Sequence, residues 1–166
     1  GTLQGSGEYV AGQQQGEWLT WHQNGQVKSR MTYHLGKLEG ASGGWRLDGE
    51  PHYSGQYIAG ARAGEWRSWH ENGELRQLET YVEGVRDGPF STWHEDGQKA
   101  STGMYAMGAT VGVWSVWANN GTKTALKTYD DEGKSHGDQR VWSEEGQLIE
   151  QTEYRHGVPT GELQRF

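Results

Sequence analysis

Aromatic and glycine positions along the chain recur with a fixed period, while the positions between them are mostly polar. A tyrosine returns after 24 residues five times and then after 25, at Tyr9, Tyr33, Tyr57, Tyr81, Tyr105, Tyr129 and Tyr154. A fixed period of about 20–50 residues is typical of proteins in which each repeat is one supersecondary unit. The pattern therefore predicts a repeat array and not a single compact core.

Three glycine columns and a second aromatic column keep the same step. An aromatic residue follows five positions after the second glycine of every unit, at Trp21, Trp45, Trp69, Trp93, Trp117, Trp142 and Phe166. The third glycine follows Asn24 or an equivalent Asn, Asp or Glu, and Asn-Gly is a strong signal for a type I′ hairpin turn. Each unit is therefore predicted to be a β-hairpin, with strands over roughly 16–23 and 26–34 in the first unit and a loop over 36–40.

A two-residue loop at Asn24-Gly25 would fix the pairing of the strands. The predicted pairs are Gly16–Tyr33, Trp18–Met31, His22–Val27, Gly64–Tyr81 and Trp66–Glu79. Because a ring over a glycine supports a weak strand position, we expect Tyr33 to cover Gly16. Trp18 and Trp21 are three residues apart and point to opposite faces of a regular strand. A β-bulge in this strand, which would put both on one face, remains an alternative.

A period of 48 residues lies over the shorter one. Residues 6–25 and 54–73 are identical at 12 of 20 positions, and residues 102–121 follow the same pattern. The intervening units replace the first tryptophan of this pattern by Ser42, Phe90 and Gln139. We therefore expect alternate hairpins to have different surroundings.

The predicted fold class is all-β, a repeat array of 24-residue antiparallel β-hairpins that form an elongated single-layer meander sheet. It is expected to be a single repeat domain over 1–166, with a half hairpin at 1–9, six hairpin units over 9–154 and a half hairpin at 154–166. The half hairpins are interpreted either as capping strands or as the ends of a piece from a longer array.

Composition narrows the classes of function. Only 32% of the residues are hydrophobic, and nine Trp and eight Tyr stand against two Phe. The net charge of −7 argues against a nucleic-acid surface or an anionic membrane surface, both of which need clustered Lys and Arg. No apolar run approaches the ~20 residues of a membrane span, so we expect no integral membrane segment.

Candidate chemistry is sparse. His22, His70 and His94 occupy one repeat position, and equivalent positions of adjacent hairpins lie roughly 9–10 Å apart. Since Zn–N distances are about 2.0–2.1 Å, such histidines cannot share an ion, and they are interpreted as solvated. The acidic run from Asp130 to Glu132 coincides with the one-residue insertion, and weak Ca²⁺ binding there is the less favoured alternative. We predict no catalytic residue, no metal site, no cofactor and no enzymatic activity.

The repeated pattern resembles the MORN-repeat superfamily, most closely a bacterial variant repeat that occurs in antitoxin-type proteins. The residues that carry the resemblance are GEWRSWHENGEL (64–75) and YVEGVRDG (81–88). It implies a single-layer hairpin array that binds partner proteins, with membrane-associated scaffolding in some eukaryotic members. It implies no catalytic residues. Residues 40–49 and 137–146 depart from the pattern because they lack the first tryptophan.

The two aromatic columns receive different predictions. The unbroken Trp21 column is expected to be the core of the sheet. The interrupted column is predicted to contact a partner protein, with glycan stacking as an alternative, and its members are Trp18, Trp66, Phe90 and Trp114.

The predicted function is non-enzymatic protein binding of the antitoxin or immunity type, which neutralises a basic toxin. The alternatives are a scaffold that self-associates through its ends, in particular by edge-to-edge pairing of residues 2–9, and carbohydrate or envelope binding through exposed aromatics. The compartment stays open between a bacterial cytoplasm and a cell envelope.

Overall fold

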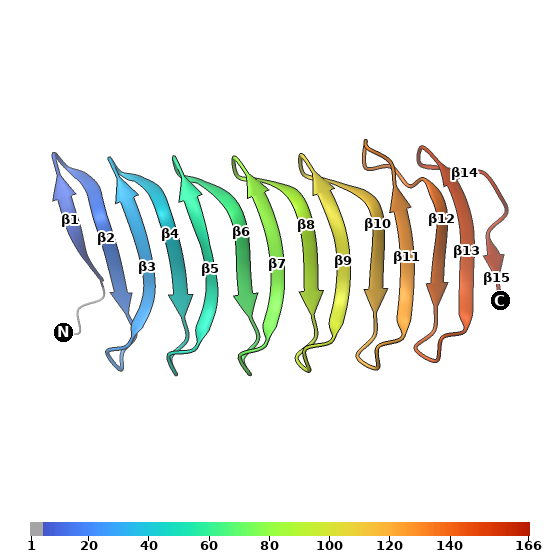
Figure 1. Ribbon diagram of the computed structural model, residues 1–166, viewed down its shortest axis with the longest axis horizontal. Helices are drawn as coiled ribbons and strands as arrows, with labels where there is room; N and C mark the ends of the chain where they lie inside the picture. Colours follow the sequence, from blue (N-terminus) through green and yellow to red (C-terminus); the bar gives the residue numbers. More distant parts are fainter. Residues whose placement is uncertain (1–4) are drawn as a thin grey trace.

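The computed structural model describes residues 5–166, which form one open antiparallel sheet of 15 strands (Figure 1). The strands follow one another in chain order from β1 to β14, and β15 pairs with β13. Their bounds are β1 (Gly5–Val10), β2 (Gln13–Trp21), β3 (Val27–His34), β4 (Lys37–Trp45), β5 (Pro51–Ile58), β6 (Ala61–Trp69), β7 (Leu75–Val82), β8 (Val85–Trp93), β9 (Lys99–Ala106), β10 (Ala109–Trp117), β11 (Lys123–Tyr129), β12 (Gly137–Trp142), β13 (Leu148–Arg155), β14 (Val158–Pro159) and β15 (Gln164–Arg165). The predicted fold class, an elongated single-layer hairpin meander, is confirmed.

The Asn-Gly turns differ from the prediction. Gly25 N–H donates to the His22 carbonyl (3.0 Å) and His22 N–H donates to the Gln26 carbonyl (2.8 Å), and of the Asn24-Gly25 pair only Gly25 has a positive φ (86°). This is a three-residue loop, a type I turn followed by a glycine in the left-handed region. Asn24 stays out of that region because its Oδ1 accepts a hydrogen bond from the Gln26 N–H (3.1 Å). The predicted type I′ turn at Asn24-Gly25 is therefore wrong.

This turn also explains which predicted strand pairs hold. Away from the turn, the predicted pairs Gly16–Tyr33, Trp18–Met31, Gly64–Tyr81 and Trp66–Glu79 are all confirmed. Next to the turn the longer loop shifts the register, so that Val27 faces Trp21 and not His22.

Type I′ turns occur instead at the opposite edge of the sheet. Leu35 and Gly36 both have positive φ (48° and 76°) and join His34 to its partner Lys37. The predicted loop over 36–40 is wrong, because β4 begins at Lys37. Gly40 (φ 87°) lies within β4 at a bulge, where the register against β3 shifts. In the sixth unit the inserted residue replaces the two-residue turn by a longer one, in which Gly133 N–H donates to the Asp130 carbonyl (3.0 Å).

The 48-residue period has a structural cause. A Cβ built on Gly55 would lie 2.3 Å from the ring of Trp66, and Gly7 and Gly103 stand in the same relation to Trp18 and Trp114, at 2.1 Å each. The tryptophan ring of every second hairpin thus lies directly on a glycine of the preceding strand. In the other hairpins the glycine position holds Met31, Glu79 or Lys127. The expected difference between alternate hairpins is confirmed.

The glycine that an aromatic ring covers is not the one predicted. No atom lies within 4 Å of a Cβ built on Gly16, so Tyr33 does not cover it. Gly16 has a φ of 72°, and it serves the bulge in its strand.

The first strand lies at an edge of the sheet, since β1 pairs with β2 alone. Residues 2–4 of the segment predicted to pair edge to edge lie outside the described residues, and self-association through this edge stays a prediction. No helix in the described part of the chain is long and apolar enough to cross a membrane.

The Trp66–Gly55 contact yields a stability prediction. Gly55→Ala would place a methyl group inside the ring of Trp66, and we expect a loss of about 1–3 kcal/mol in the free energy of unfolding, typical of overpacking. Gly161→Ala is the matched control, because nothing lies within 4 Å of a Cβ there. Urea denaturation of both variants measures the effect. Equal midpoints for Gly55→Ala and the wild type would contradict the packing described here.

Candidate functional site

Trp66, predicted to contact a partner, is the most enclosed of the tryptophans. Only 5% of its surface is exposed. Its ring meets Tyr57 edge to face at a centroid distance of 5.0 Å and Tyr81 at 6.4 Å, and it stacks on Tyr53 at 6.2 Å. Trp66 is therefore part of the core of the sheet, because its ring fills the space above Gly55.

The other three predicted contact residues are half-buried and also pack against aromatic rings. Trp18 lies edge to face with Tyr9 (5.0 Å), and Phe90 stacks on Trp114 at a centroid distance of 5.4 Å. Partner binding through these residues stays a prediction, but their packing makes them part of the aromatic core of the sheet.

The unbroken Trp21 column, predicted to be the core, is half-buried throughout the six tryptophans. This column lies on the opposite face from Trp18. The pairing of β2 with β3 is continuous from Trp18 to Thr20, and the extra residue at the register shift beside Trp21 is in β3. Side chains of β2 therefore alternate regularly between Trp18 and Trp21. Basic side chains lie over two of its rings, Arg30 at 6.0 Å from the Trp45 centroid and Lys123 at 5.2 Å from that of Trp117. The predicted order of burial between the two columns is thus reversed at Trp66.

The histidine column has a structural role that sequence analysis missed. The Nε2 atoms of His22, His70 and His94 donate to the carbonyls of Trp45 (2.9 Å), Trp93 (2.7 Å) and Trp117 (2.9 Å). Because a carbonyl oxygen only accepts, Nε2 carries the proton in each ring. These side chains join successive hairpins and do not converge on one another.

Glu79 is a buried carboxylate in the middle of the array. Its Oε2 accepts a hydrogen bond from Arg86 Nε (2.8 Å), and its Oε1 accepts one from the Tyr81 hydroxyl (2.8 Å). The hydrogen bond to Glu79 raises the pKa of Arg86. Arg62 lies 3.8 Å from Glu79 and 4.3 Å above the Trp66 ring centroid. A carboxylate held by two arginines is poorly suited to proton transfer, so this cluster favours stability over acid–base chemistry.

An open cavity of ≈ 320 Å³ adjoins this cluster. Its walls are Tyr53, Tyr57, Arg62, Trp66, Arg67, Ser68, Gln77 and Glu79. The polar groups of Arg62 and Glu79 already pair with each other and with Tyr81, so the cavity offers a packing surface and not a set of free catalytic groups.

Large exposed apolar side chains gather at the type I′ turns, and these turns form the upper edge of the sheet in Figure 1. We call this set the apolar turn edge, and it consists of Val10, Leu35, Ile58, Val82, Met107 and Val158. The exposed fractions reach 59% at Leu35 and 86% at Met107. Both residues have left-handed backbones, with φ of 48° and 46°, a region that favours Gly, Asn and Asp.

Sequence analysis missed the apolar turn edge because it placed the type I′ turns at the other edge. The signal was present in the position before the first glycine of each unit, where Leu35 and Met107 are unusual residues for a tight turn.

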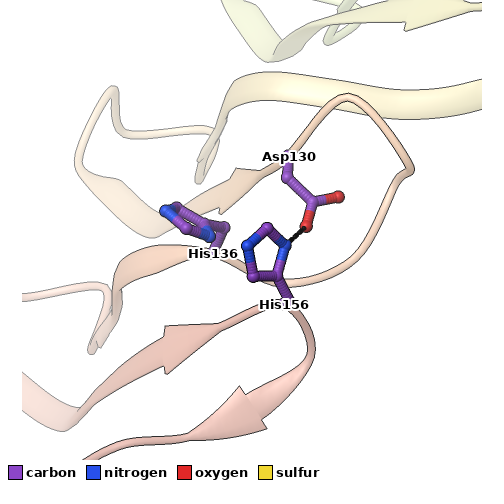
Figure 2. Close-up of side chains that lie close together, drawn as sticks. All are labelled: Asp130, His136 and His156. Atoms are coloured by element: carbon purple, nitrogen blue, oxygen red, sulfur yellow. Dashed lines mark hydrogen bonds and ion pairs between the residues drawn. The ribbon is translucent and has the colours of Figure 1, made fainter.

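A second group at the same edge consists of Asp130, His136 and His156, and Figure 2 shows their arrangement. One possible ligand atom from each residue lies within 4.8 Å of the others, and His156 Nδ1 is 2.7 Å from Asp130 Oδ2. Desolvation opposes ionisation of Asp130, but hydrogen bonds from the Lys134 N–H, the His156 ring and the Glu132 N–H lower its pKa on balance.

The acidic run considered for Ca²⁺ does not converge. Glu132 pairs with Lys134 Nζ at 2.6 Å, away from the two histidines that meet Asp130. Sequence analysis weighed the run from Asp130 to Glu132 and missed the histidines, which lie six and 26 residues further along the chain.

The fold and its recurring units define a single-layer β-hairpin repeat protein. A family model described as MORN repeat variant matches residues 14–34, 62–83 and 135–156. These three matches support an array of MORN repeats. MORN repeats are non-enzymatic modules that generally bind proteins or membranes. The third match covers a unit in which Gln139 replaces the first tryptophan, so that departure does not remove the unit from the family. A search of curated proteins found no match.

The burial of Trp66 predicts how the two tryptophan columns differ in stability. Trp66→Ala should lower the free energy of unfolding by about 3–5 kcal/mol, as loss of a buried large aromatic does. Trp69→Ala, on the opposite face, should cost less because that ring is only half-buried. Chemical denaturation of the two variants makes the comparison. A larger loss for Trp69→Ala would show that the half-buried column is the stronger support of the sheet.

Proposed function

We propose that this chain is a protein-binding module that engages its partner through the apolar turn edge. The observation that carries the proposal is the row of exposed apolar side chains at five successive turns and at the last turn of one sheet edge. Contiguous exposed apolar surface is uncommon on soluble proteins, and it marks interaction sites. Successive hairpins are two strands apart, so the row repeats every ~9–10 Å.

The turns that carry the row are held firmly. Gly36 N–H donates to the Gln14 carbonyl (2.9 Å), Gly60 N–H to that of Leu38 (2.8 Å) and Gly108 N–H to that of Arg86 (2.8 Å). Each bond links a turn to a neighbouring strand of the sheet. A surface that is already ordered loses little conformational entropy on binding, which favours affinity.

Charge selects the class of partner. The net charge of −7 disfavours an anionic membrane surface and favours a protein with a basic surface, which long-range attraction would steer towards the array. The specific form of this proposal is an antitoxin or immunity role, in which the chain covers a basic toxin. The apolar turn edge would then supply the contact area, and the negative net charge would supply the selectivity for a basic partner.

Substitution to asparagine separates binding from folding. In a combined variant with Leu35→Asn and Met107→Asn, the new residues suit the left-handed backbone, so we expect stability to be kept or to rise by up to about 1 kcal/mol. We expect capture of the partner from an extract of the native host to fall at least about tenfold, because two apolar contacts are lost. Quantitative affinity capture and urea denaturation provide the two measurements.

Leu47→Asn is the matched control. Leu47 is exposed to a similar degree (57%) but lies in an Asn-Gly-type turn at the opposite edge. Capture that survives Leu47→Asn and fails in the combined variant supports the proposed surface. Capture that is equal in all three proteins, or that fails only with Leu47→Asn, would place the contact elsewhere.

The antitoxin form needs a separate test. The captured partner, expressed alone in a bacterial host, should arrest growth, and co-expression of the wild-type chain should restore it. The combined variant should restore growth poorly. A partner that is harmless when expressed alone would leave general protein binding as the function and remove the antitoxin role.

A further inference from the structure

We infer that Asp130, His136 and His156 form a binding site for a divalent transition metal ion, with Zn²⁺ as the ion that suits it best. The inference rests on geometry and ligand chemistry and is independent of the proposed partner surface. Two imidazoles and one carboxylate are a ligand set that zinc uses in sites with three protein ligands and one open position. Within residues 5–166, these three residues are the one group whose ligand atoms converge in this way.

The repeat geometry brings these residues together. In the first two units the residue before the second glycine bonds to the turn of the next hairpin. Gln15 thus accepts a hydrogen bond from the Leu35 N–H (3.0 Å), and Glu39 accepts one from the Ala59 N–H (2.7 Å). His136 occupies the position of Gln15 and Glu39. His156 occupies the turn position of Leu35 and Ala59, so the fold places the two imidazoles side by side, with ring centroids 5.0 Å apart.

The inserted residue adds the third ligand. The longer turn after β11 lets Asp130 Oδ1 accept hydrogen bonds from the Glu132 N–H (3.0 Å) and the Lys134 N–H (2.9 Å). These bonds hold the carboxylate so that its other oxygen, Oδ2, meets His156. The Asp130 side chain is only 11% exposed, so the ligand oxygen is partly shielded from water.

The backbone of all three ligands is fixed in a similar way. Asp130 N–H donates to the Lys134 carbonyl (2.9 Å), and His136 N–H donates to the Thr128 carbonyl (2.9 Å). The turn that carries His156 is tied to the segment of His136 by the bond from the Gly157 N–H to the Ser135 carbonyl (2.7 Å). Sites held by such outer contacts bind metal more tightly than flexible ones.

One ligand atom is left without any other use. His136 Nδ1 is buried and has no hydrogen-bond partner among the described residues. Buried polar atoms without a partner are uncommon, and each calls for an explanation. A metal ion bound between the two imidazoles would occupy this position.

The distances between the ligand atoms fit a zinc site after a small rearrangement of the side chains. Ligand atoms about 2.0–2.1 Å from a tetrahedral zinc ion lie about 3.3 Å from each other, whereas the three ligand atoms lie within 4.8 Å here. His156 sits in an exposed turn, so its ring can turn to shorten the wider separations, while the 2.7 Å between His156 Nδ1 and Asp130 Oδ2 opens slightly. The proton between His156 and Asp130 would leave to solvent when both become ligands.

The location suggests what the ion would do. The β11–β12 pairing contains only two residue pairs, Ala125–Val141 and Leu126–Arg140, against six for β12–β13. The proposed ligands come from the turn after β11, the segment before β12 and the turn after β13. A bound ion would therefore join both sides of the β11–β12 seam, which has the fewest residue pairs of any seam between β1 and β13.

Isothermal titration of untagged, metal-free protein with Zn²⁺ tests the inference. We expect one ion per chain, a rise of the melting temperature on addition of Zn²⁺, and reversal by a chelator. His136→Gln and His156→Gln should each weaken binding at least about tenfold, since loss of a direct ligand should cost no less than loss of an outer-shell contact. Asp130→Asn should weaken binding while its side-chain oxygen still caps the turn.

His34→Gln is the matched control, because His34 is an exposed histidine beside another turn of the same edge and contacts Gln15. It should bind Zn²⁺ as the wild type does. Absence of binding, affinity that His136→Gln and His156→Gln leave unchanged, or an equal loss in His34→Gln would overturn the inference. If a ligand variant fails to fold, the absorption spectrum of the Co²⁺-loaded wild type provides the test. We expect the spectrum of a four-coordinate Co²⁺ ion. A spectrum like that of octahedral aqueous Co²⁺ would refute the site.

Discussion

The contact between a tryptophan ring and a bare glycine supports this sheet. A single-layer sheet has no second layer to bury its side chains, and none of the described side chains is less than 2% exposed. The rings of Trp18, Trp66 and Trp114 solve this problem by lying flat on Gly7, Gly55 and Gly103. Each ring excludes water from the backbone beneath it, and tyrosines close its sides. The core is thus a series of small aromatic clusters spread along the ribbon.

Periodicity and register followed from sequence, but the turns did not. Asn-Gly suits both a type I′ turn and a type I turn with a following glycine, and the difference depends on whether Asn24 bonds to Gln26, which the sequence does not show. At the other edge, Leu35 and Met107 occupy left-handed positions against their propensity. Pairing of the flanking strands overrides that local preference, so a reading based on turn residues chooses the wrong edge.

The reversed roles of the tryptophan columns have a related cause. Because it is uninterrupted, the Trp21 column is predicted from sequence to be the core, and the interrupted column is predicted to contact a partner. The interruption instead follows the glycines, since each covering tryptophan comes 11 residues after its glycine, as in Gly7–Trp18, Gly55–Trp66 and Gly103–Trp114. Where Met31 or Glu79 occupies the glycine position of the repeat, there is no bare backbone for a tryptophan ring to cover. The covering rings are predicted by the glycine column and the tryptophan column together, and neither column predicts them alone.

The group of Asp130, His136 and His156 shows how one repeat can depart from the others. In two units the residue before the second glycine, Gln15 or Glu39, accepts a hydrogen bond from the backbone of the next turn. This contact can acquire new chemistry without a change of fold, because only the two facing residues need to differ. His136 and His156 make that change, and the insertion beside Asp130 adds an acid ligand at the β11–β12 seam, where only two residue pairs join the strands. The short strand pairing and the three ligands lie at the same place in the array, and we interpret the proposed ion as compensation for the short pairing.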